Sequence, residues 1–174
     1  DREVPSFKTT PEASDIYPLL KSMLAAGCSE AVMEVSSHGI HQNRVAGLDM
    51  EVAVFLNLTR DHLDYHGNME SYFTAKARLF ELLPKDGYAI INLDDEYGKR
   101  MIEYSNAKVI TYGEDETADF VIEGIDLKPN HSSFTITNSK TEESTIINTN
   151  LVAKFNVFNL TAALVAVSAK RDIP

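Results

Sequence analysis

The sequence is poor in cysteine and in basic residues, and it contains no long hydrophobic run. A single cysteine, Cys28, excludes an intramolecular disulfide framework and is typical of a reducing compartment. Sixteen lysines and arginines stand against 26 acidic residues, and the formal net charge of −10 argues against nucleic acid or an anionic membrane as the main partner. No stretch suits a transmembrane helix, and the first residues lack the basic-then-apolar pattern of a signal peptide. We therefore expect a cytoplasmic protein that binds any phosphorylated ligand through a local group of residues.

What is present is a pattern of alternating helices and strands. With 174 residues, 44% of them hydrophobic, the chain is long enough for one domain with a sizeable core. Periodicity and turn residues predict helices at 14–26, 69–83, 94–104 and 156–170, and strands at 31–35, 52–57, 88–92 and 108–112. Short alternating strands follow from 119 to 151, with turns at 129–130 and 138–139. The predicted fold is α/β: a mostly parallel sheet flanked by helices (1–113), a small antiparallel β meander (114–151) and a returning helix (152–174).

Two apolar, strand-like runs each end in polar residues. The run at 31–33 meets Glu34, and the run at 52–56 meets the polar segment 57–67. Because ligands of open parallel sheets bind beyond the carboxyl ends of the strands, we expect the chemistry at this edge. A buried carboxylate is costly without a partner, so Glu34 is expected to lie near a cation; the alternative is that it lies in solvent just past the strand.

The segment after the second run carries four side chains that could bind a metal ion: Asp61, His62, Asp64 and His66. Mg²⁺ prefers oxygen ligands and keeps several waters, so two or three of these groups would be enough. They could equally be exposed polar groups of a loop. A metal-dependent hydrolase that uses these four residues and a metal-bound water therefore stays open as an alternative function.

Lys76 occupies the apolar stripe of its own predicted helix. Met69, Phe73, Lys76, Phe80 and Leu83 follow one another at spacings of four, three, four and three residues. A cationic group on such a stripe must reach out to solvent, pair with an anion or be chemically changed. The residues alone leave these three possibilities open.

Several other side chains are candidates for binding an anionic or polar ligand. Arg44 has the donor geometry for a phosphate or carboxylate, although most arginines are surface residues. Hydroxyl and amide groups for the same kind of ligand come from Thr9, Thr10, Ser36 and Gln42. Near the start of the last helix, Asn156 and Asn159 could cap the helix or bind the edge of a base.

Six motifs in order and spacing resemble the central ATPase domain of the Mur ligases, most closely the MurE type of peptidoglycan synthesis. The motifs are 9–12 (TTPE), 33–38 (MEVSSH), 42–45 (QNRV), 57–67 (NLTRDHLDYHG), 72–76 (YFTAK) and 155–160 (FNVFNL). They extend over nearly the whole chain, which makes the resemblance highly specific. The fold that it implies is that of a Mur ligase central domain with a phosphate-binding loop.

The resemblance implies an ATP-dependent amide ligase. ATP would phosphorylate the terminal carboxyl group of UDP-N-acetylmuramoyl-L-alanyl-D-glutamate, and the amine of meso-diaminopimelate or L-lysine would attack the acyl phosphate. It also implies that Glu34 and His62 are Mg²⁺ ligands and that Lys76 is a carbamylated catalytic lysine. The contacts to the UDP-muramyl dipeptide would come from Thr9, Thr10, Ser36, Gln42 and Arg44, and those to the adenine from Asn156 and Asn159.

The sequence departs from the family in one respect. It contains no Gly-x-x-x-x-Gly-Lys-Ser/Thr loop; the nearest match, Gly98-Lys99-Arg100, lacks the first glycine and the hydroxyl. We therefore interpret the chain as an internal, incomplete part of the ligase, without the phosphate loop, the amino-terminal UDP-binding domain or the carboxyl-terminal domain. On this interpretation the chain by itself is inactive. A non-catalytic module that binds muramyl peptides is the second alternative.

Overall fold

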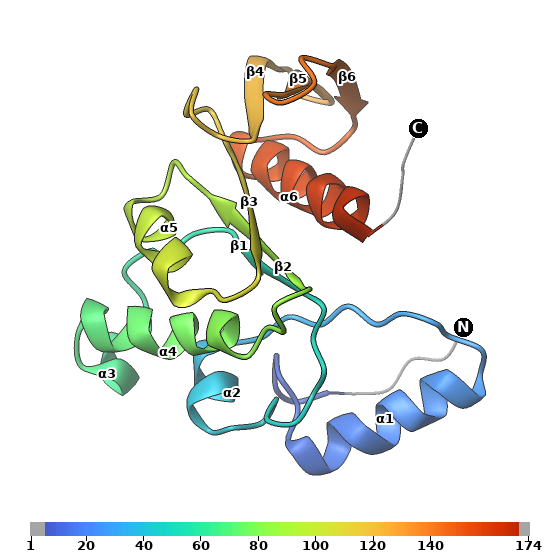
Figure 1. Cartoon of the computed structure of the whole chain (residues 1–174), viewed down its shortest axis with the longest axis vertical. Coiled ribbons are helices and arrows are strands. Elements are labelled where there is room, and N and C mark those ends of the chain that lie inside the picture. The colour runs from blue at the N-terminus through green and yellow to red at the C-terminus, as the bar shows by residue number, and fades with distance from the viewer. Residues whose placement is uncertain (1–5, 171–174) are drawn as a thin grey trace. The chain divides into compact units, whose positions relative to one another are not determined.

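The computed structural model describes residues 6–170. The chain forms two compact units, shown with their elements labelled in Figure 1. The first consists of Asp1–Asp49 and His62–Leu79, and the second of Met50–Asp61 and Phe80–Pro174. Each unit carries part of the predicted chemistry, so each is described by itself.

The second unit contains a six-stranded sheet whose strands follow one another in chain order, from β1 to β6. The first four strands are parallel, whereas β4, β5 and β6 are joined as antiparallel neighbours. The strands are β1 (Val52–Phe55), β2 (Tyr88–Asn92), β3 (Lys108–Gly113), β4 (Phe120–Leu127), β5 (Ser132–Asn138) and β6 (Ser144–Thr149). This sheet confirms the predicted fold class, including the change to an antiparallel meander.

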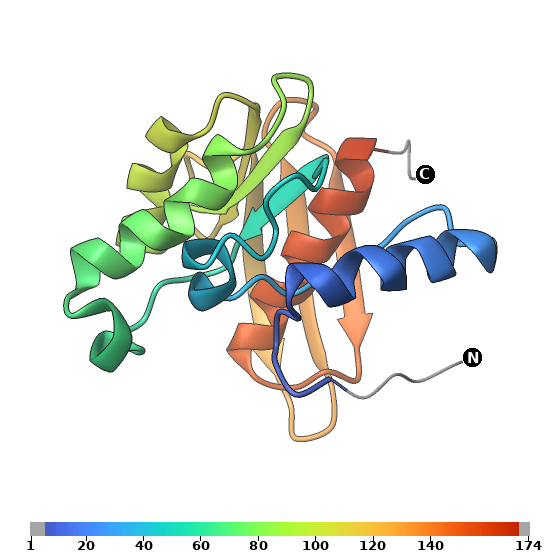
Figure 2. The ribbon, with the colours of Figure 1, turned by 90° about the horizontal axis from the view of Figure 1, so that it is seen from below.

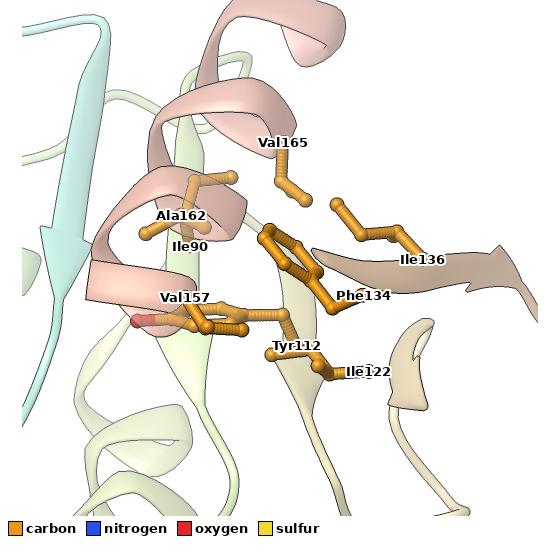
Figure 3. Packing of buried hydrophobic residues seen from close by; sticks show 8 residues of the cluster. All are labelled: Ile90, Tyr112, Ile122, Phe134, Ile136, Val157, Ala162 and Val165. Atoms are coloured by element: carbon orange, nitrogen blue, oxygen red, sulfur yellow. The ribbon is translucent and has the colours of Figure 1, made fainter. Parts of the chain in front are cut away.

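Helices cover both faces of this sheet because its strands are apolar on both sides. The long helix α6 (Lys154–Lys170) packs on one face, where Val157 and Val165 meet Ile90 and Phe134 (Figure 3). On the other face α5 (Glu96–Met101) and the 3₁₀ turn η1 (Ile102–Tyr104) lie against the sheet (Figure 2). Successive side chains of a strand point to opposite faces of the sheet, so neighbouring apolar residues of β2 pack against helices on opposite faces.

The first unit is helical. Its helices are α1 (Ala13–Ala25), α2 (Ser37–His41), α3 (Leu63–His66) and α4 (Met69–Glu81), the last of which continues for two residues into the second unit. The hydroxyl oxygen of Ser36 accepts the backbone N–H of Gly39 at 3.1 Å and caps the start of α2. No helix within residues 6–170 is long and apolar enough to cross a membrane.

The prediction of a strand at 31–35 was wrong, and two short helices were not predicted. Residues 28–36 have no regular secondary structure, and no described strand pairs with them. A run of β-forming residues gains little without a neighbouring strand to supply ladder hydrogen bonds. The short helices α2 and α3 are too brief to show a helical period. Two other predicted elements differ from the structure only in where they begin or end. The strand β1 ends at Phe55, and the helix predicted at 94–104 begins at Glu96 and continues as a 3₁₀ turn after Met101.

Candidate functional site

In the first unit, Thr10 joins two distant segments of the chain. Its side chain is fully buried, and its Oγ1 accepts the N–H of Ser36 at 2.8 Å and donates to the carbonyl oxygen of Glu34 at 3.1 Å. Gly39 makes this close approach possible, because a Cβ at that position would lie 2.8 Å from Cγ2 of Thr10. The threonine thus fixes the backbone on both sides of Val35 although that segment forms no strand.

Like Thr10, Arg44 holds several segments of this region together, and only 8% of it is exposed. Its Nη1 donates to the carbonyl oxygen of Thr10 at 2.8 Å, and its Nη2 donates to Oε1 of Gln42. Its Nε lies 3.4 Å from Oε1 of Glu12, which also pairs with Lys8. These contacts bring Thr10, Ser36, Gln42 and Arg44 together, as their predicted shared role requires, and Thr9 lies exposed beside them.

Four histidines and two tyrosines form a ring cluster in the same unit. The ring of His38 lies 4.0 Å from Tyr65 and 5.0 Å from His62, measured between centroids. Nδ1 of His41 is 2.9 Å from the hydroxyl of Tyr65, which also accepts a hydrogen bond from Nε2 of Gln42 at 3.2 Å. The remaining two members, His66 and Tyr72, stack on each other. We call these six residues the histidine–tyrosine cluster.

His66 is held in this cluster by a hydrogen bond. Its Nε2 lies 2.9 Å from Oγ of Ser37, whose side chain is almost fully buried. Burial lowers the pKa of His66, and the neighbouring rings of His38, His41 and His62 lower it further. The ring is therefore predominantly neutral at neutral pH, so it can share a hydrogen bond with a hydroxyl without bringing in a charge.

Lys76 lies half-buried on α4, next to this cluster. Its Nζ is 5.5 Å from the centroid of the Tyr72 ring, within the range of a cation–π contact. The residues on the same stripe, Phe73 and Phe80, are buried. The apolar surroundings expected from the spacing are thus present.

Glu34 and His62, the predicted metal ligands, both have exposed side chains. His62 has the left-handed backbone conformation, with φ 54°, and directly precedes α3. Among residues 6–170, no three histidine, cysteine, aspartate or glutamate side chains form a group that could hold a metal ion. The hydrolase site suggested by Asp61, His62, Asp64 and His66 therefore finds no support, and the two-residue Mg²⁺ site with a carbamate remains a prediction.

A cavity of about 360 Å³ lies at the carboxyl ends of β1 and β2 in the second unit, next to the start of α6. This is the place where open parallel sheets bind ligands. It combines aromatic rings with amide and carboxylate groups. The lining residues are Leu56, Asn57, Asn92, Asp94, Asp95, Lys154, Phe155, Phe158 and Asn159.

Three polar residues of this cavity are held by hydrogen bonds to backbone groups. Nδ2 of Asn92 donates to the carbonyl oxygen of Leu56 at 2.8 Å, and Oδ2 of Asp95 accepts the N–H of Leu58 at 2.8 Å. The two oxygens of Asp94 accept the N–H groups of residues 114 and 115. Because these bonds connect the ends of neighbouring strands, the cavity is rigid on its sheet side.

Of the two asparagines predicted to bind a base, only Asn159 lines the cavity. Nδ2 of Asn156 donates instead to the carbonyl oxygen of Val152 at 2.7 Å. The sequence analysis gave no binding role to Asn57, Asn92 and Asp94, which it placed at the ends of the predicted strands 52–57 and 88–92 and at the start of the predicted helix 94–104. The rule that ligands bind beyond the carboxyl ends of strands would have selected them, because each follows or ends a correctly predicted strand.

The comparisons with known proteins agree with one another. The family model of the Mur ligase middle domain matches residues 3–167. The UDP-N-acetylmuramoyl-L-alanyl-D-glutamate--2,6-diaminopimelate ligase of Synechococcus elongatus is 46% identical over 160 residues, which are 91% of this chain and 32% of that protein. The ligase of the same name from Geobacillus thermodenitrificans is 43% identical over 175 aligned residues, 95% of this chain and 35% of that protein.

A solved structure gives the same result. A UDP-N-acetylmuramoyl-L-alanyl-D-glutamate--2,6-diaminopimelate ligase superimposes with a TM-score of 0.82 and 37% identity, over 92% of this chain and 34% of that one. The chain spans about one third of the length of the curated relatives that it matches.

Proposed function

The chain belongs to the Mur ligase middle-domain family, and from this premise we propose that it is the ATP-using part of an amide ligase of peptidoglycan precursor synthesis. The relatives' names support UDP-N-acetylmuramoyl-L-alanyl-D-glutamate and 2,6-diaminopimelate as substrates. The observation that carries the proposal is the cavity at the carboxyl ends of β1 and β2, because its rings and amides suit a nucleobase. The single cysteine fits a cytoplasmic location.

The proposed reaction has two steps. A carboxylate oxygen of the dipeptide attacks the γ-phosphorus of ATP, the bond to the β-phosphate oxygen breaks, and ADP leaves. The amine of the incoming amino acid then attacks the acyl carbon, inorganic phosphate leaves with the bonding electrons, and a proton is released. Phosphoryl transfer of this kind depends mainly on positioning and on stabilisation of charge.

Asn159 and the two phenylalanines are the residues that would hold the base. Phe155 and Phe158 offer ring faces, and Asn159 offers an amide donor and acceptor at the start of a helix fixed on the sheet. Asn156, whose amide bonds to the backbone, would act by shaping the first turn of α6. The phosphates would lie toward a part of the site for which the chain has no glycine-rich loop motif.

We expect Asn159→Ala to weaken adenine-nucleotide binding by about 0.5–1.5 kcal/mol, the range for the loss of one hydrogen bond, because the side chain of Asn159 is exposed. Calorimetric titration of ADP into a full-length ligase that contains this segment measures the change. The variant should lose the same binding free energy for AMP as for ADP, because the proposed contact is to the base. Asn150→Ala, an exposed asparagine outside this cavity, serves as the control. Unchanged ADP affinity in the Asn159 variant would contradict the assignment.

The network around Thr10 would bind the UDP-muramyl dipeptide. Arg44 holds the backbone of Thr10 and the side chain of Gln42, so it keeps these groups in one arrangement for an anionic substrate. Thr9, which is exposed beside them, and Ser36 would add hydroxyl contacts.

In a full-length ligase, Arg44→Ala should weaken binding of the UDP-muramyl dipeptide by about 1.5–3 kcal/mol, the scale of a charge-assisted hydrogen bond. The Michaelis constant for the dipeptide should rise accordingly, whereas the one for ATP should change little. Arg100→Ala, on α5 of the other unit, is the matched control. If the dipeptide constant stays at its wild-type value, Arg44 has no part in substrate binding.

Glu34, His62 and Lys76 are proposed to serve one Mg²⁺ site. Magnesium would neutralise charge on the transferring phosphate, and it accepts a site with few protein ligands because it keeps its waters. The amine of Lys76 would attack CO₂, one C=O π bond would move onto oxygen, and a proton would leave to solvent. The resulting carbamate places an anion where the sequence has a half-buried cation.

A further inference from the structure

Two asparagines that line the cavity have side-chain amides without a hydrogen bond. Asn57 follows β1 and Asn159 lies on α6; both are exposed, and neither amide bonds to any group within residues 6–170. The other polar side chains of the cavity already have partners: the ammonium group of Lys154 pairs with Glu114, and the remaining three bond to backbone groups. The two amides are therefore available to a ligand.

On the amino-terminal side of Asn57, the backbone is held by Asn92. This residue ends β2, and only 6% of it is exposed. Its Nδ2 donates to the carbonyl oxygen of Leu56 at 2.8 Å, and its Oδ1 accepts the N–H of Asp94 at 3.0 Å. Both polar atoms of the Asn92 amide are thus bound to backbone groups, as buried polar groups generally are. Asn92 therefore acts on a ligand by fixing the strand end that carries Asn57.

On the carboxyl-terminal side of Asn57, the backbone is held by Asp95. Its Oδ2 accepts the N–H of Leu58 at 2.8 Å, and its Oδ1 accepts the N–H of Tyr97 at 2.9 Å, which caps the start of α5. Leu58 is itself buried. Asn57 is therefore an exposed residue between two fixed neighbours. A ligand that binds it does not have to order the backbone, which lowers the entropy cost of binding.

The charged groups of the cavity indicate which part of a nucleotide lies beside Asn57. The carboxylates of Asp94 and Asp95 line the same cavity, and a carboxylate repels a phosphate group. The cation of Lys154 is already paired with Glu114. An amide offers both donors and an acceptor, which match the hydroxyl groups of a ribose and the nitrogen atoms of a base. The lining therefore favours the uncharged adenosine part of ATP over its phosphates.

We propose that Asn57 binds the adenosine part of ATP through its side-chain amide, and that Asn92 is a positioning residue that fixes the strand end for this contact. The inference rests on the proposed function, because it assumes that the cavity is the adenine-nucleotide site. Asn57 and Asn159 would then bind the same ligand from two elements, the end of β1 and the amino-terminal part of α6.

Replacing Asn57 by alanine tests the contact. In a full-length ligase that contains this segment, Asn57→Ala should weaken ADP binding by about 2- to 10-fold, the effect of losing one hydrogen bond. Calorimetric titration should give the same loss for AMP and for adenosine, because the contact does not involve the phosphates. Asn106→Ala, an exposed asparagine just before β3 and outside the cavity, is the matched control. Unchanged affinity for ADP, or a loss for ADP that is absent with AMP, would overturn the proposal.

A double-mutant cycle tests the positioning role of Asn92. Asn92→Ala should weaken ADP binding by about 2- to 10-fold in the wild-type background and cause little further loss in Asn57→Ala, because its effect passes through Asn57. Asp95→Asn, a smaller change that keeps one backbone bond, should show the same dependence. Thr111→Val removes a buried hydroxyl that bonds to Asp119; it should also destabilise the protein, but leave ADP binding unchanged. Losses that add in full would overturn the positioning role.

The positioning role can also be tested on the 174-residue chain without a ligand. The backbone N–H of Asn57 should have an NMR order parameter of about 0.85 in the wild type and below about 0.6 in Asn92→Ala. Equal order parameters would overturn this role. If Asn159→Ala weakens ADP binding and Asn57→Ala does not, the contact of Asn57 alone is overturned. If neither variant changes ADP binding, the assignment of the cavity as the nucleotide site is overturned as well.

Discussion

Replacing Lys76 by alanine should lower kcat of a full-length ligase by roughly 10²- to 10³-fold, the cost of removing one group that stabilises charge in the transition state. Lys76 lies half-buried next to the histidine–tyrosine cluster, and the proposed carbamate would supply an anion at that position. The fold should be retained, because alanine is the best helix former and α4 continues on both sides. Steady-state kinetics together with circular dichroism would measure both effects.

Controls distinguish a carbamate from an ordinary lysine. Short carboxylates such as acetate or formate should partly restore Lys76→Ala by standing in for the carbamate oxygens. Lys85→Ala, an exposed lysine just beyond α4, should leave kcat unchanged. A lysine that merely extends to solvent would be replaceable by methionine at little cost. Near-normal activity of Lys76→Met would therefore refute the role of this residue.

Gly98→Ala should destabilise the second unit by about 3 kcal/mol, at the upper end for an overpacked site. Gly98 lies in α5, where a Cβ would be 1.8 Å from the backbone carbonyl oxygen of Asn92. That oxygen belongs to the last residue of β2 and cannot swing away as a side chain could. The gain of about 1 kcal/mol from the higher helix propensity of alanine is smaller than this clash.

Thermal unfolding of the 174-residue chain measures the effect, and a fall in melting temperature of about 10 °C corresponds to it. Gly124→Ala in the same unit is the matched control, since φ is +60° there and the nearest atom, Oγ1 of Thr135, would be 4.0 Å from the new Cβ. Gly124→Ala should lower the free energy of unfolding by about 1 kcal/mol, the cost of the left-handed backbone conformation alone. Equal melting temperatures for the two variants would show that α5 can move away from β2. Asn92 also lines the cavity, so Gly98→Ala should weaken nucleotide binding as well.

The parallel sheet could be predicted because its strands and helices carry strong local signals. The apolar run 88–92 is bounded by turn residues and became β2 without change, and the stripe through Phe73 and Phe80 predicted α4 to within two residues. The antiparallel strands follow from their alternation and turns. Residues 31–35 show the limit of this reasoning: their composition favours a strand, but a strand also needs a neighbour to pair with, which composition does not reveal.

The candidate site was predictable where one residue is chemically out of place or belongs to a specific motif. Lys76 is conspicuous on an apolar stripe, and Arg44 and Thr10 belong to motifs and indeed share a hydrogen bond. Tyr72 lies in the motif 72–76 as well, but no role was predicted for it, because a tyrosine on the apolar side of a helix is usually part of the core. The cavity residues Asn57, Asn92 and Asp94 come from segments up to 37 residues apart and meet only through the register of β1 and β2. Glu34, expected near a cation, has an exposed side chain, and its role stays a prediction.

The most direct test of the proposed acyl-phosphate chemistry is an isotope-transfer measurement on a full-length ligase that contains this segment. UDP-N-acetylmuramoyl-L-alanyl-D-glutamate with ¹⁸O in its glutamate carboxyl groups is supplied with ATP and 2,6-diaminopimelate, and the inorganic phosphate is analysed by mass spectrometry. If a carboxylate oxygen attacks ATP and the amine then displaces phosphate, each phosphate released with the amide product carries one ¹⁸O. Phosphate without ¹⁸O would mean that water attacks ATP, and it would contradict the formation of an acyl phosphate.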